Sequence, residues 1–399
     1  MADGTHKLKV GFADQLRDIE VALPPGEPKP WDAASKLDVV GKPHPRIEAA
    51  AKVSGAARYT HDQRPAGLVH AAVLRSPHPC AVLDALDLGP ARAAPGVVAV
   101  LAVAKVGDRL LFAGQDVAAV AASTPEQAHA ALRQISVRYT PQPFVVDTLA
   151  ATADGAPVVH PGKVSERATE GDEPGTAGAA SQRGNLRTSP SQKKGDADKG
   201  MRQAKVTHEA TYTTQNHTHS ALETHSIVVR WDTPRSMTAW CSTQGIFSVR
   251  DELAEVFSLK PQDVHVITEF LGGGFGAKFG ASAPGTRLGF IAGELARQAK
   301  APVALLLDRR EEHLCTGNRP DSIQKVTLGA TAAGELTAIK VLAHGSGGIG
   351  TGAGVGRNAF AIYTKCPNIR VESHDVFTHA GPATAFRAPG HPQGAFAIE

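Results

Sequence analysis

The stretch that most constrains this chain is EFLGGGFGAKFG, residues 269–280, which places five glycines in twelve residues directly after the strand-like run VHVIT. Glycine has no Cβ atom, so its backbone adopts positive φ angles readily and can lie flush against a flat or bulky group. A plain strand-to-helix turn needs only one or two glycines. The spacing therefore predicts a loop whose backbone N–H groups contact a cofactor, with Phe275 as a fixed side-chain wall.

Length and charge limit the class of protein. The chain has 399 residues, 42 % of them hydrophobic, which is enough for two or three domains with real cores. Lysine and arginine number 42 against 39 acidic residues, so the net charge of +3 provides no basic field for nucleic acid or an anionic membrane. No apolar run reaches the roughly 18 residues of a membrane span, and Met1 to Glu20 contain none of signal-peptide length. We expect small molecules and proteins as partners, and a cytoplasmic location unless a partner carries an export signal.

The cysteines argue against an iron–sulfur centre in this chain. Cys80, Cys241, Cys315 and Cys366 lie far apart in sequence and form no C-x-x-C pair. A ferredoxin-type cluster needs four thiolates at close, patterned spacings. We therefore expect buried or free thiols in a reducing compartment.

Composition and hydrophobic patterning divide the chain into four parts. Residues 171–200 contain no aromatic residue and one leucine, so they cannot bury enough surface to offset the entropy of ordering. The first domain shows short strand-like runs around one helix-like stretch, and the last region alternates strands and helices. The predicted parts are a polar lead-in at 1–37, an α+β domain at 38–150, a largely disordered linker at 151–203 and an α/β region at 204–399.

The last region has the clearest pattern of secondary structure. Leu288, Ile291, Leu295 and Ala299 recur at helical spacing and predict one buried helix face. The predicted helices are 248–258 and 286–299, and the predicted strands are 225–231, 236–242, 264–268, 301–308 and 336–344.

Two motifs leave other functions open. His217, His219, Glu223 and His225 follow the H-x-H-x-x-x-E order of a metal-binding cupin strand, and their side chains suit iron or manganese. The glycines that bracket such a strand are missing, so a polar strand end with hydrogen-bonded histidines is the competing interpretation.

The second motif is GSGGIG, residues 345–350, which satisfies G-x-G-x-x-G after a strand and is followed by Glu372. A Rossmann dinucleotide oxidoreductase would need an amphipathic helix between them. The glycine-rich residues 351–368 do not provide one, and a surface loop is the alternative.

Two longer stretches resemble the molybdenum-binding subunits of the xanthine oxidase and aldehyde oxidase family. They are STQGIFSVRDELAEVFSLKPQDVHVITEFLGGGFGAK, residues 242–278, and TAFRAPGHPQGAFAIE, residues 384–399, in the same order as in that family. HSALETHSIVVRW, residues 219–231, and the N-terminal region match as well. The resemblance covers nearly all of the chain from residue 38 except the linker. It implies an α+β chain, with an α/β hammerhead domain followed by the first half of a molybdopterin-binding α/β region.

The resemblance also implies site residues. The glycine loop would lie against molybdenum and the pterin, with Phe275 at the metal through its backbone. Gln244 corresponds to a glutamine whose side chain reaches an oxygen ligand of molybdenum, and Arg387 to an arginine whose backbone lines the other side. An amide can donate to such an oxygen without changing charge with pH. The implied cofactor-binding residues are Gly272, Gly273, Gly274, Phe275, Gly276, Gln244 and Arg387, of which Gln244, Phe275 and Arg387 are also at the metal.

The implied reaction is the hydroxylation of an electron-poor carbon in an aldehyde or an aromatic N-heterocycle, with water as the oxygen source. The implied cofactor is molybdopterin with molybdenum, with or without a nucleotide. Electrons would leave through 2Fe-2S clusters to FAD. Because the cysteines here cannot hold those clusters, the resemblance implies an iron–sulfur subunit and an FAD-binding subunit as partners.

Departures from the family pattern bear on substrate and catalysis. Phe279 stands where purine-oxidising relatives carry a glutamate, and Pro389 where they carry an aromatic residue. With Phe386 they are the predicted substrate-contacting residues, and they favour an aldehyde or a simple heterocycle over xanthine. In the family a second molybdopterin-binding half follows and holds the general-base glutamate. We therefore expect the base beyond Glu399, in a fragment's missing half or a second polypeptide, and no activity of this chain alone.

Overall fold

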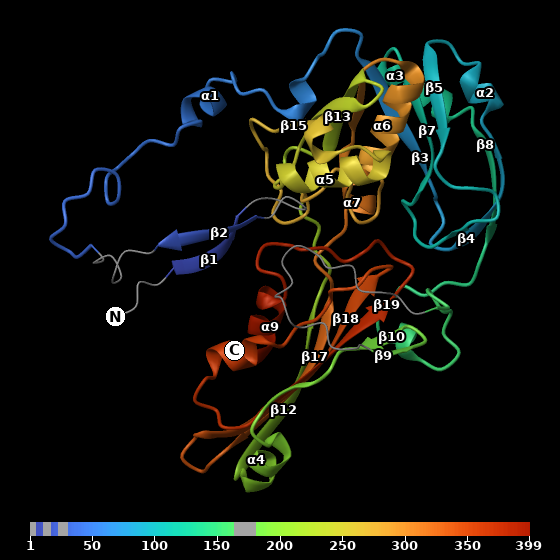
Figure 1. Cartoon of the computed structure of the whole chain (residues 1–399). Coiled ribbons are helices and arrows are strands. Elements are labelled where there is room, and N and C mark those ends of the chain that lie inside the picture. Colours follow the sequence, from blue (N-terminus) through green and yellow to red (C-terminus); the bar gives the residue numbers. More distant parts are fainter. Residues whose placement is uncertain (1–4, 11–16, 23–30, 163–180) are drawn as a thin grey trace. The chain divides into compact units, whose positions relative to one another are not determined.

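The structure is a computed structural model, which describes residues 5–10, 17–22, 31–162 and 181–399 (Figure 1). The chain forms two compact units, residues 1–57 and residues 58–399.

The first unit contains a hairpin within the predicted polar lead-in. The strands β1 (Thr5–Val10) and β2 (Arg17–Ala22) pair antiparallel, and a short helix α1 covers Ala49–Val53. The predicted polar lead-in at 1–37 thus contains two paired strands. A paired ladder satisfies its own backbone groups, which the composition of the segment does not reveal. Most of the proline-rich stretch lies outside the described residues.

A seven-stranded sheet organises one half of the second unit. Its order is β15-β14-β13-β16-β3-β7-β5, and β16 pairs in parallel with β3. This sheet joins strands from both sides of the predicted linker, so the boundary proposed at 151–203 does not separate two sheets. The strands are β3 (Val69–Arg75), β5 (Val97–Ala102), β7 (Asp116–Ala122), β13 (Ser226–Thr233), β14 (Ser236–Cys241), β15 (Val264–Ile267) and β16 (Val303–Leu306).

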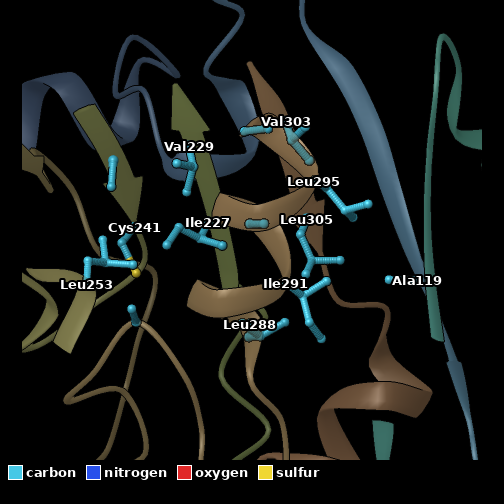
Figure 2. Close-up of a cluster of buried hydrophobic side chains, with 14 of the residues drawn as sticks. Ala119, Ile227, Val229, Cys241, Leu253, Leu288, Ile291, Leu295, Val303 and Leu305 are labelled. Atoms are coloured by element: carbon cyan, nitrogen blue, oxygen red, sulfur yellow. The ribbon is translucent and has the colours of Figure 1, made fainter. Parts of the chain in front are cut away.

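Two predicted helices, α5 (Ile246–Phe257) and α6 (Leu288–Ala299), belong to the main core of this half. Figure 2 shows Leu288, Ile291 and Leu295 of α6 among strand residues such as Ile227 and Leu305. These three helix side chains are at most 2 % exposed. The predicted buried face is confirmed, because residues at helical spacing share one side of the helix.

Shorter elements surround this sheet. The one helix-like stretch predicted in the first domain, residues 124–134, is confirmed as α3. This helix begins after Thr124, whose side chain accepts a hydrogen bond from the N–H of Gln127. A three-stranded sheet has the order β6-β4-β8. The elements are β4 (Ala81–Asp87), β6 (Arg109–Leu110), β8 (Ser136–Pro141), α2 (Gly89–Arg92), α3 (Pro125–Leu132), α7 (Arg309–Cys315) and the 3-10 helices Thr60–Asp62, Ala150–Thr152 and Pro261–Asp263.

A second seven-stranded sheet builds the other half of the unit. Its main path is β12-β17-β18-β19-β10-β9, and β11 pairs with β19 beside β10. Helices α8 and α9 contact each other, and α9 also contacts β12 and β17. The elements are β9 (Ser181–Arg183), β10 (Leu186–Thr188), β11 (Gln192–Lys194), α4 (Ala197–Gln203), β12 (Val206–Thr214), β17 (Ser322–Ala330), β18 (Leu336–Gly348), α8 (Asn358–Ile362), β19 (Ile369–Phe377) and α9 (His391–Ile398).

The predicted disordered linker is wrong for residues 181–203. They form β9, β10, β11 and α4, and both β10 and β11 extend the sheet at β19. Arg187 makes a buried ion pair with Asp375 at 2.9 Å, and the Asn185 side chain accepts from the N–H of Val159 at 2.9 Å. Order here comes from polar contacts and ladder pairing, which a count of apolar residues does not measure. Residues 163–180 of the predicted linker lie outside the described residues.

Candidate cofactor-binding site

The glycine loop follows β15, as the sequence predicts, and it has an unusual backbone. Gly273 and Gly276 have φ angles of +105° and +107°, and Phe275 between them has φ +54°. A bulky non-glycine residue with positive φ is strained and is typical of sites where the surroundings impose the conformation. A Cβ atom on Gly276 would lie 2.7 Å from the carbonyl oxygen of Ala385, so the backbone at Ala385 leaves no room for a side chain at Gly276.

Gln244 lies against this loop. Its Oε1 accepts a hydrogen bond from the N–H of Gly276 at 2.8 Å, and its own N–H donates to the carbonyl oxygen of Lys278 at 2.5 Å. Because the N–H of Gly276 is a donor, the side-chain atom of Gln244 that faces it is the acceptor Oε1. Nε2 therefore faces away from the loop. Gln244 is exposed, and no acceptor for Nε2 is found in the described part of the chain. The side chain is thus an oriented amide with a free donor.

The segment that precedes α9 also contacts the glycine loop. The N–H of Arg387 donates to the carbonyl oxygen of Phe275 at 2.8 Å. The carbonyl oxygen of Arg387 accepts from the buried Arg319 guanidinium at 2.8 Å, and Ala388 has φ +58°. Gln244 and the glycine loop therefore meet a third segment that lies more than a hundred residues further along the chain. The N–H of Arg387 is already bonded within the protein. Any backbone contact of this segment with a ligand would therefore come from atoms next to that N–H.

The three predicted substrate-contacting residues have different surroundings. The Phe386 ring stacks on the His219 ring at a centroid distance of 4.4 Å, and the Cζ of Arg319 lies 4.6 Å from the same ring. Pro389 is exposed, and Phe279 is half-buried. Within the described ranges no ring contact joins Phe279 to Phe386. Phe386 and Pro389 thus lie on the segment that precedes α9 and contacts the glycine loop. The substrate-contacting roles of Phe279, Phe386 and Pro389 stay predictions.

The loop offers a row of unpaired donors. Across the described residues, no acceptor is found for the backbone N–H groups of Gly273, Gly274 and Phe275, whereas those of Gly272 and Gly276 are bonded to side chains. Successive free N–H groups in a loop with positive φ angles form a concave site for anionic oxygen atoms. Together with the Nε2 of Gln244, these groups fit an oxygen-rich, anionic cofactor.

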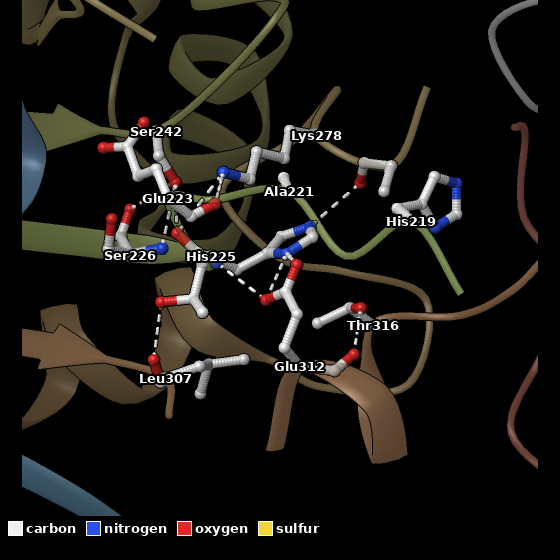
Figure 3. A network of polar contacts seen from close by, with 12 residues as sticks. His219, Ala221, Glu223, His225, Ser226, Ser242, Lys278, Leu307, Glu312 and Thr316 are labelled. Atoms are coloured by element: carbon white, nitrogen blue, oxygen red, sulfur yellow. Dashed lines mark hydrogen bonds and ion pairs between the residues drawn. The ribbon is translucent and has the colours of Figure 1, made fainter. Parts of the chain in front are cut away.

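A buried polar network supports the loop from behind (Figure 3). Glu223 accepts from the N–H of Gly272 at 2.7 Å, and the Nζ of Lys278 donates to the carbonyl oxygen of Glu223 at 2.6 Å. His225 contacts both the Glu312 carboxylate and the carbonyl oxygen of Ala277. Both ends of the loop are thereby tied to the same short stretch before β13.

Sequence reasoning missed the role of this network. Neither Lys278 nor Glu312 in α7 is among the site residues predicted from the sequence. The sequence does contain one signal. Lys278 is a charged residue among small and apolar neighbours, a pattern that is unusual for a lysine at the surface. The side chain is in fact 1 % exposed.

Burial and charge shift the pKa values in the network. Burial lowers the pKa of Lys278, although the nearby Glu223 and Glu312 carboxylates oppose this. Burial acts to raise the pKa of Glu312, but hydrogen bonds and charge from His225 lower it by more, so its pKa lies below its ordinary value. Glu312 is therefore a carboxylate in the folded protein at neutral pH.

This shift predicts how stability depends on pH. Because the pKa of Glu312 is lower in the folded than in the unfolded chain, its stabilising contribution is complete above the ordinary value of 4.5. It is lost as pH falls from there through the folded value. Urea unfolding of the wild type and of Glu312→Gln should show a difference in unfolding free energy that shrinks below pH 4.5. A difference that stays constant over that range would contradict the shift.

The two alternative motifs do not form sites. His219 bonds the carbonyl oxygen of Ala385, His225 bonds Glu312, and Glu223 bonds the loop, so the predicted cupin ligands point to different partners. No group of three or more histidine, cysteine or carboxylate side chains placed to hold a metal ion exists in the described ranges. The motif at 345–350 begins in the last residues of β18, and the next helix is the five-residue α8, so the Rossmann alternative does not hold.

Comparison with known proteins identifies the family. A family model described as a molybdopterin cofactor-binding domain matches residues 180–399, more than half of the chain. The chain therefore belongs to the molybdopterin cofactor-binding domain family, and the predicted resemblance is confirmed.

Three relatives illustrate the match. The aldehyde oxidoreductase molybdenum-binding subunit PaoC of Escherichia coli (strain K12) is 29 % identical, over 91 % of this chain and 48 % of that protein. The nicotinate dehydrogenase large molybdopterin subunit of Eubacterium barkeri is 28 % identical, over 90 % of this chain and 84 % of that protein. The structure of reconstituted CO dehydrogenase from Oligotropha carboxidovorans superposes with a TM-score of 0.76 at 24 % identity, over 90 % of this chain and 47 % of that one. The chain thus spans about half the length of the first curated relatives it matches, and the mixed α/β fold is that of molybdenum enzymes.

In the ranges described, no helix is long and apolar enough to span a membrane.

Proposed function

We propose that this chain is the molybdenum-cofactor-binding part of a molybdenum hydroxylase that oxidises aldehydes or N-heterocycles. The observation that carries the proposal is the convergence of Gln244, the loop 272–276 and the segment 385–387 at one place, in a chain of the molybdopterin cofactor-binding family. The free donors of Gln244 and of the loop lie close together, which is what binding of an anionic cofactor requires.

The residues of this chain would hold and orient the cofactor. When bound, the cofactor would supply the two-electron oxidation of a substrate carbon, with the oxygen atom taken from water. Gln244 would donate from Nε2 to an oxygen of the cofactor, and the N–H groups of Gly273, Gly274 and Phe275 would stabilise negative charge without reorganising. The half-exposed Phe275 ring would exclude water from one side. Gln244, Phe275 and Arg387 are the residues that we place nearest the metal.

The proposed substrate is an aldehyde or a simple N-heterocycle rather than a purine. Phe279 provides no carboxylate and Pro389 no aromatic ring at the two positions that would anchor a purine, and Phe386 contributes an aromatic face. Two of the relatives are named as an aldehyde oxidoreductase subunit and a nicotinate dehydrogenase subunit, which supports these substrate classes.

The proposed complex includes further parts. We assign the predicted domain at residues 38–150 to an α/β hammerhead domain. The general-base glutamate and the remaining cofactor contacts would come from a second molybdopterin-binding half, and 2Fe-2S clusters and FAD from partner subunits. All four cysteines are buried and unpaired, which supports the cytoplasm as the compartment.

Molybdenum content tests the proposal. In a bacterial host that makes the cofactor, the purified 399-residue chain should carry far less than one molybdenum per chain. Co-expression with the polypeptide that supplies the second half should raise this to about one per chain. Gly276→Val, whose Cβ atom would meet the carbonyl oxygen of Ala385, should lower that content as a control. Absence of molybdenum in the co-expressed complex would reject the function, and a full complement in the chain alone would reject the need for a second half.

A further inference from the structure

His225 occupies a position in which both ring nitrogens face acceptors. Its Nδ1 lies 3.0 Å from both carboxylate oxygens of Glu312, and its Nε2 lies 3.1 Å from the carbonyl oxygen of Ala277. The side chains of His225 and Glu312 are only 5 % and 1 % exposed, so water cannot serve in place of either partner. A carbonyl oxygen only accepts, and so does an ionised carboxylate. Each ring nitrogen must therefore carry a proton.

The charges around the ring agree with this arrangement. Both oxygens of Glu223 accept backbone N–H groups, from Thr60 at 3.3 Å and Gly272 at 2.7 Å, an arrangement that an ionised carboxylate satisfies. Glu312 is likewise a carboxylate, and Lys278 couples electrostatically to both. Lys278 is the buried cation beside these two carboxylates, and Arg309, which also interacts with Lys278, is exposed, so an imidazolium ring at His225 improves the charge balance inside the network.

The contact with Ala277 reaches the candidate site through one peptide group. The carbonyl of the peptide between Ala277 and Lys278 accepts from His225, and its N–H lies 3.4 Å from the Oε1 of Gln244. The carbonyl oxygen of Lys278 in turn accepts from the backbone N–H of Gln244. The ring therefore orients the peptide that orients the Gln244 amide.

We infer that His225 is a doubly protonated positioning residue, which holds the Ala277–Lys278 peptide so that Gln244 binds the loop through Oε1 and presents Nε2 outward. The ring itself touches neither cofactor nor substrate in this arrangement. The functional meaning of the position rests on the proposed function, whereas the protonation state and the tether belong to the chain alone.

The experiment uses the purified 399-residue chain without cofactor. In the wild type, ¹⁵N NMR of labelled histidines should show one ring with two similar nitrogen shifts, as an imidazolium ring has. In Glu312→Gln the new amide can donate to Nδ1, so that ring should become a neutral Nε2–H tautomer with two well-separated shifts. Separated shifts for His225 in the wild type would overturn the doubly protonated state.

Hydrogen exchange tests the tether. In His225→Gln one side chain cannot donate to both partners at once, so the amides of Gly276 and Lys278 should exchange about tenfold faster. Exchange in α6 should stay as in the wild type, and so should exchange at Gly276 in the control His344→Gln, a half-buried histidine of the other sheet. Unchanged exchange at both amides in a folded His225→Gln would overturn the positioning role.

Two provisions keep the outcome decisive. If His225→Gln does not fold, hydrogen exchange is measured in Glu312→Gln instead. Protection of the Gly276 amide that is retained there, together with the tautomer change, supports the tether through Nε2. Loss of that protection overturns the tether. Molybdenum content of the co-expressed complex is measured separately. Absence of molybdenum with a confirmed tether would reject the proposed function alone.

Discussion

Replacing Gln244 by glutamate is expected to lower turnover about tenfold to hundredfold in the molybdenum-loaded complex, while molybdenum content stays near that of the wild type. The carboxylate keeps the acceptor that binds the N–H of Gly276 at 2.8 Å. It removes the outward Nε2 donor and puts a negative charge beside the oxygen atoms of an anionic cofactor. Steady-state kinetics with an aromatic aldehyde and with nicotinate, alongside metal analysis, measure the effect.

Two further variants make this result specific. Gln244→Ala removes both contacts, so it should also speed exchange of the Gly276 amide, which Gln244→Glu should leave protected. Gln262→Glu is the matched control, because it makes the same change at an exposed position before β15. Normal turnover of Gln244→Glu at full molybdenum occupancy would remove this side chain from the cofactor site.

Arg75→Met should lower the free energy of unfolding by about 3–5 kcal/mol, the largest effect on stability that we expect from one substitution. The Arg75 guanidinium in β3 pairs with Asp116 and also with Glu311 of α7, at 3.0 Å to the latter. The arginine and Asp116 side chains are 8 % and 5 % exposed. Removing the cation leaves two carboxylates without their charge partner, one of them deeply buried. Urea unfolding followed by tryptophan fluorescence measures the loss.

The matched control is Arg297→Met in α6. Arg297 pairs with Glu294 three residues earlier at 2.6 Å, but its side chain is 61 % exposed. Such a surface pair contributes about 0–1 kcal/mol, so this variant should unfold almost like the wild type. Equal losses for Arg75→Met and Arg297→Met would show that the buried cluster does not hold β3, β7 and α7 together.

Elements with strong periodicity were predicted correctly from the sequence. In α6 the apolar residues Leu288, Ile291 and Leu295 lie on one side whatever the helix packs against, because 3.6 residues make one turn. The glycine loop was also predicted, because positive φ angles at Gly273 and Gly276 are conformations that glycine permits at little cost.

Elements stabilised by distant partners were not predicted. The strands β10 and β11 within residues 181–203 have few apolar side chains, and they are ordered by the edge of β19 and by the pair between Arg187 and Asp375. Asp375 lies 188 residues away, so no local pattern reveals this partner. A prediction from composition counts the cost of ordering but not contacts of this kind.

The sequence by itself determined the family, the mixed α/β class and the glycine loop, and it predicted Gln244, Phe275 and Arg387 as residues of one site. These depend on local backbone freedom, on periodicity and on the resemblance of ordered motifs, all of which can be read along the chain. Only the tertiary structure decided which way the Gln244 amide faces, that the Arg387 N–H is already bonded to Phe275, and that a buried network of His225, Glu312, Lys278 and Glu223 lies behind the loop. The physical reason is that hydrogen-bond direction and charge balance depend on groups brought together from separate strands and helices, and these distances are absent from the sequence.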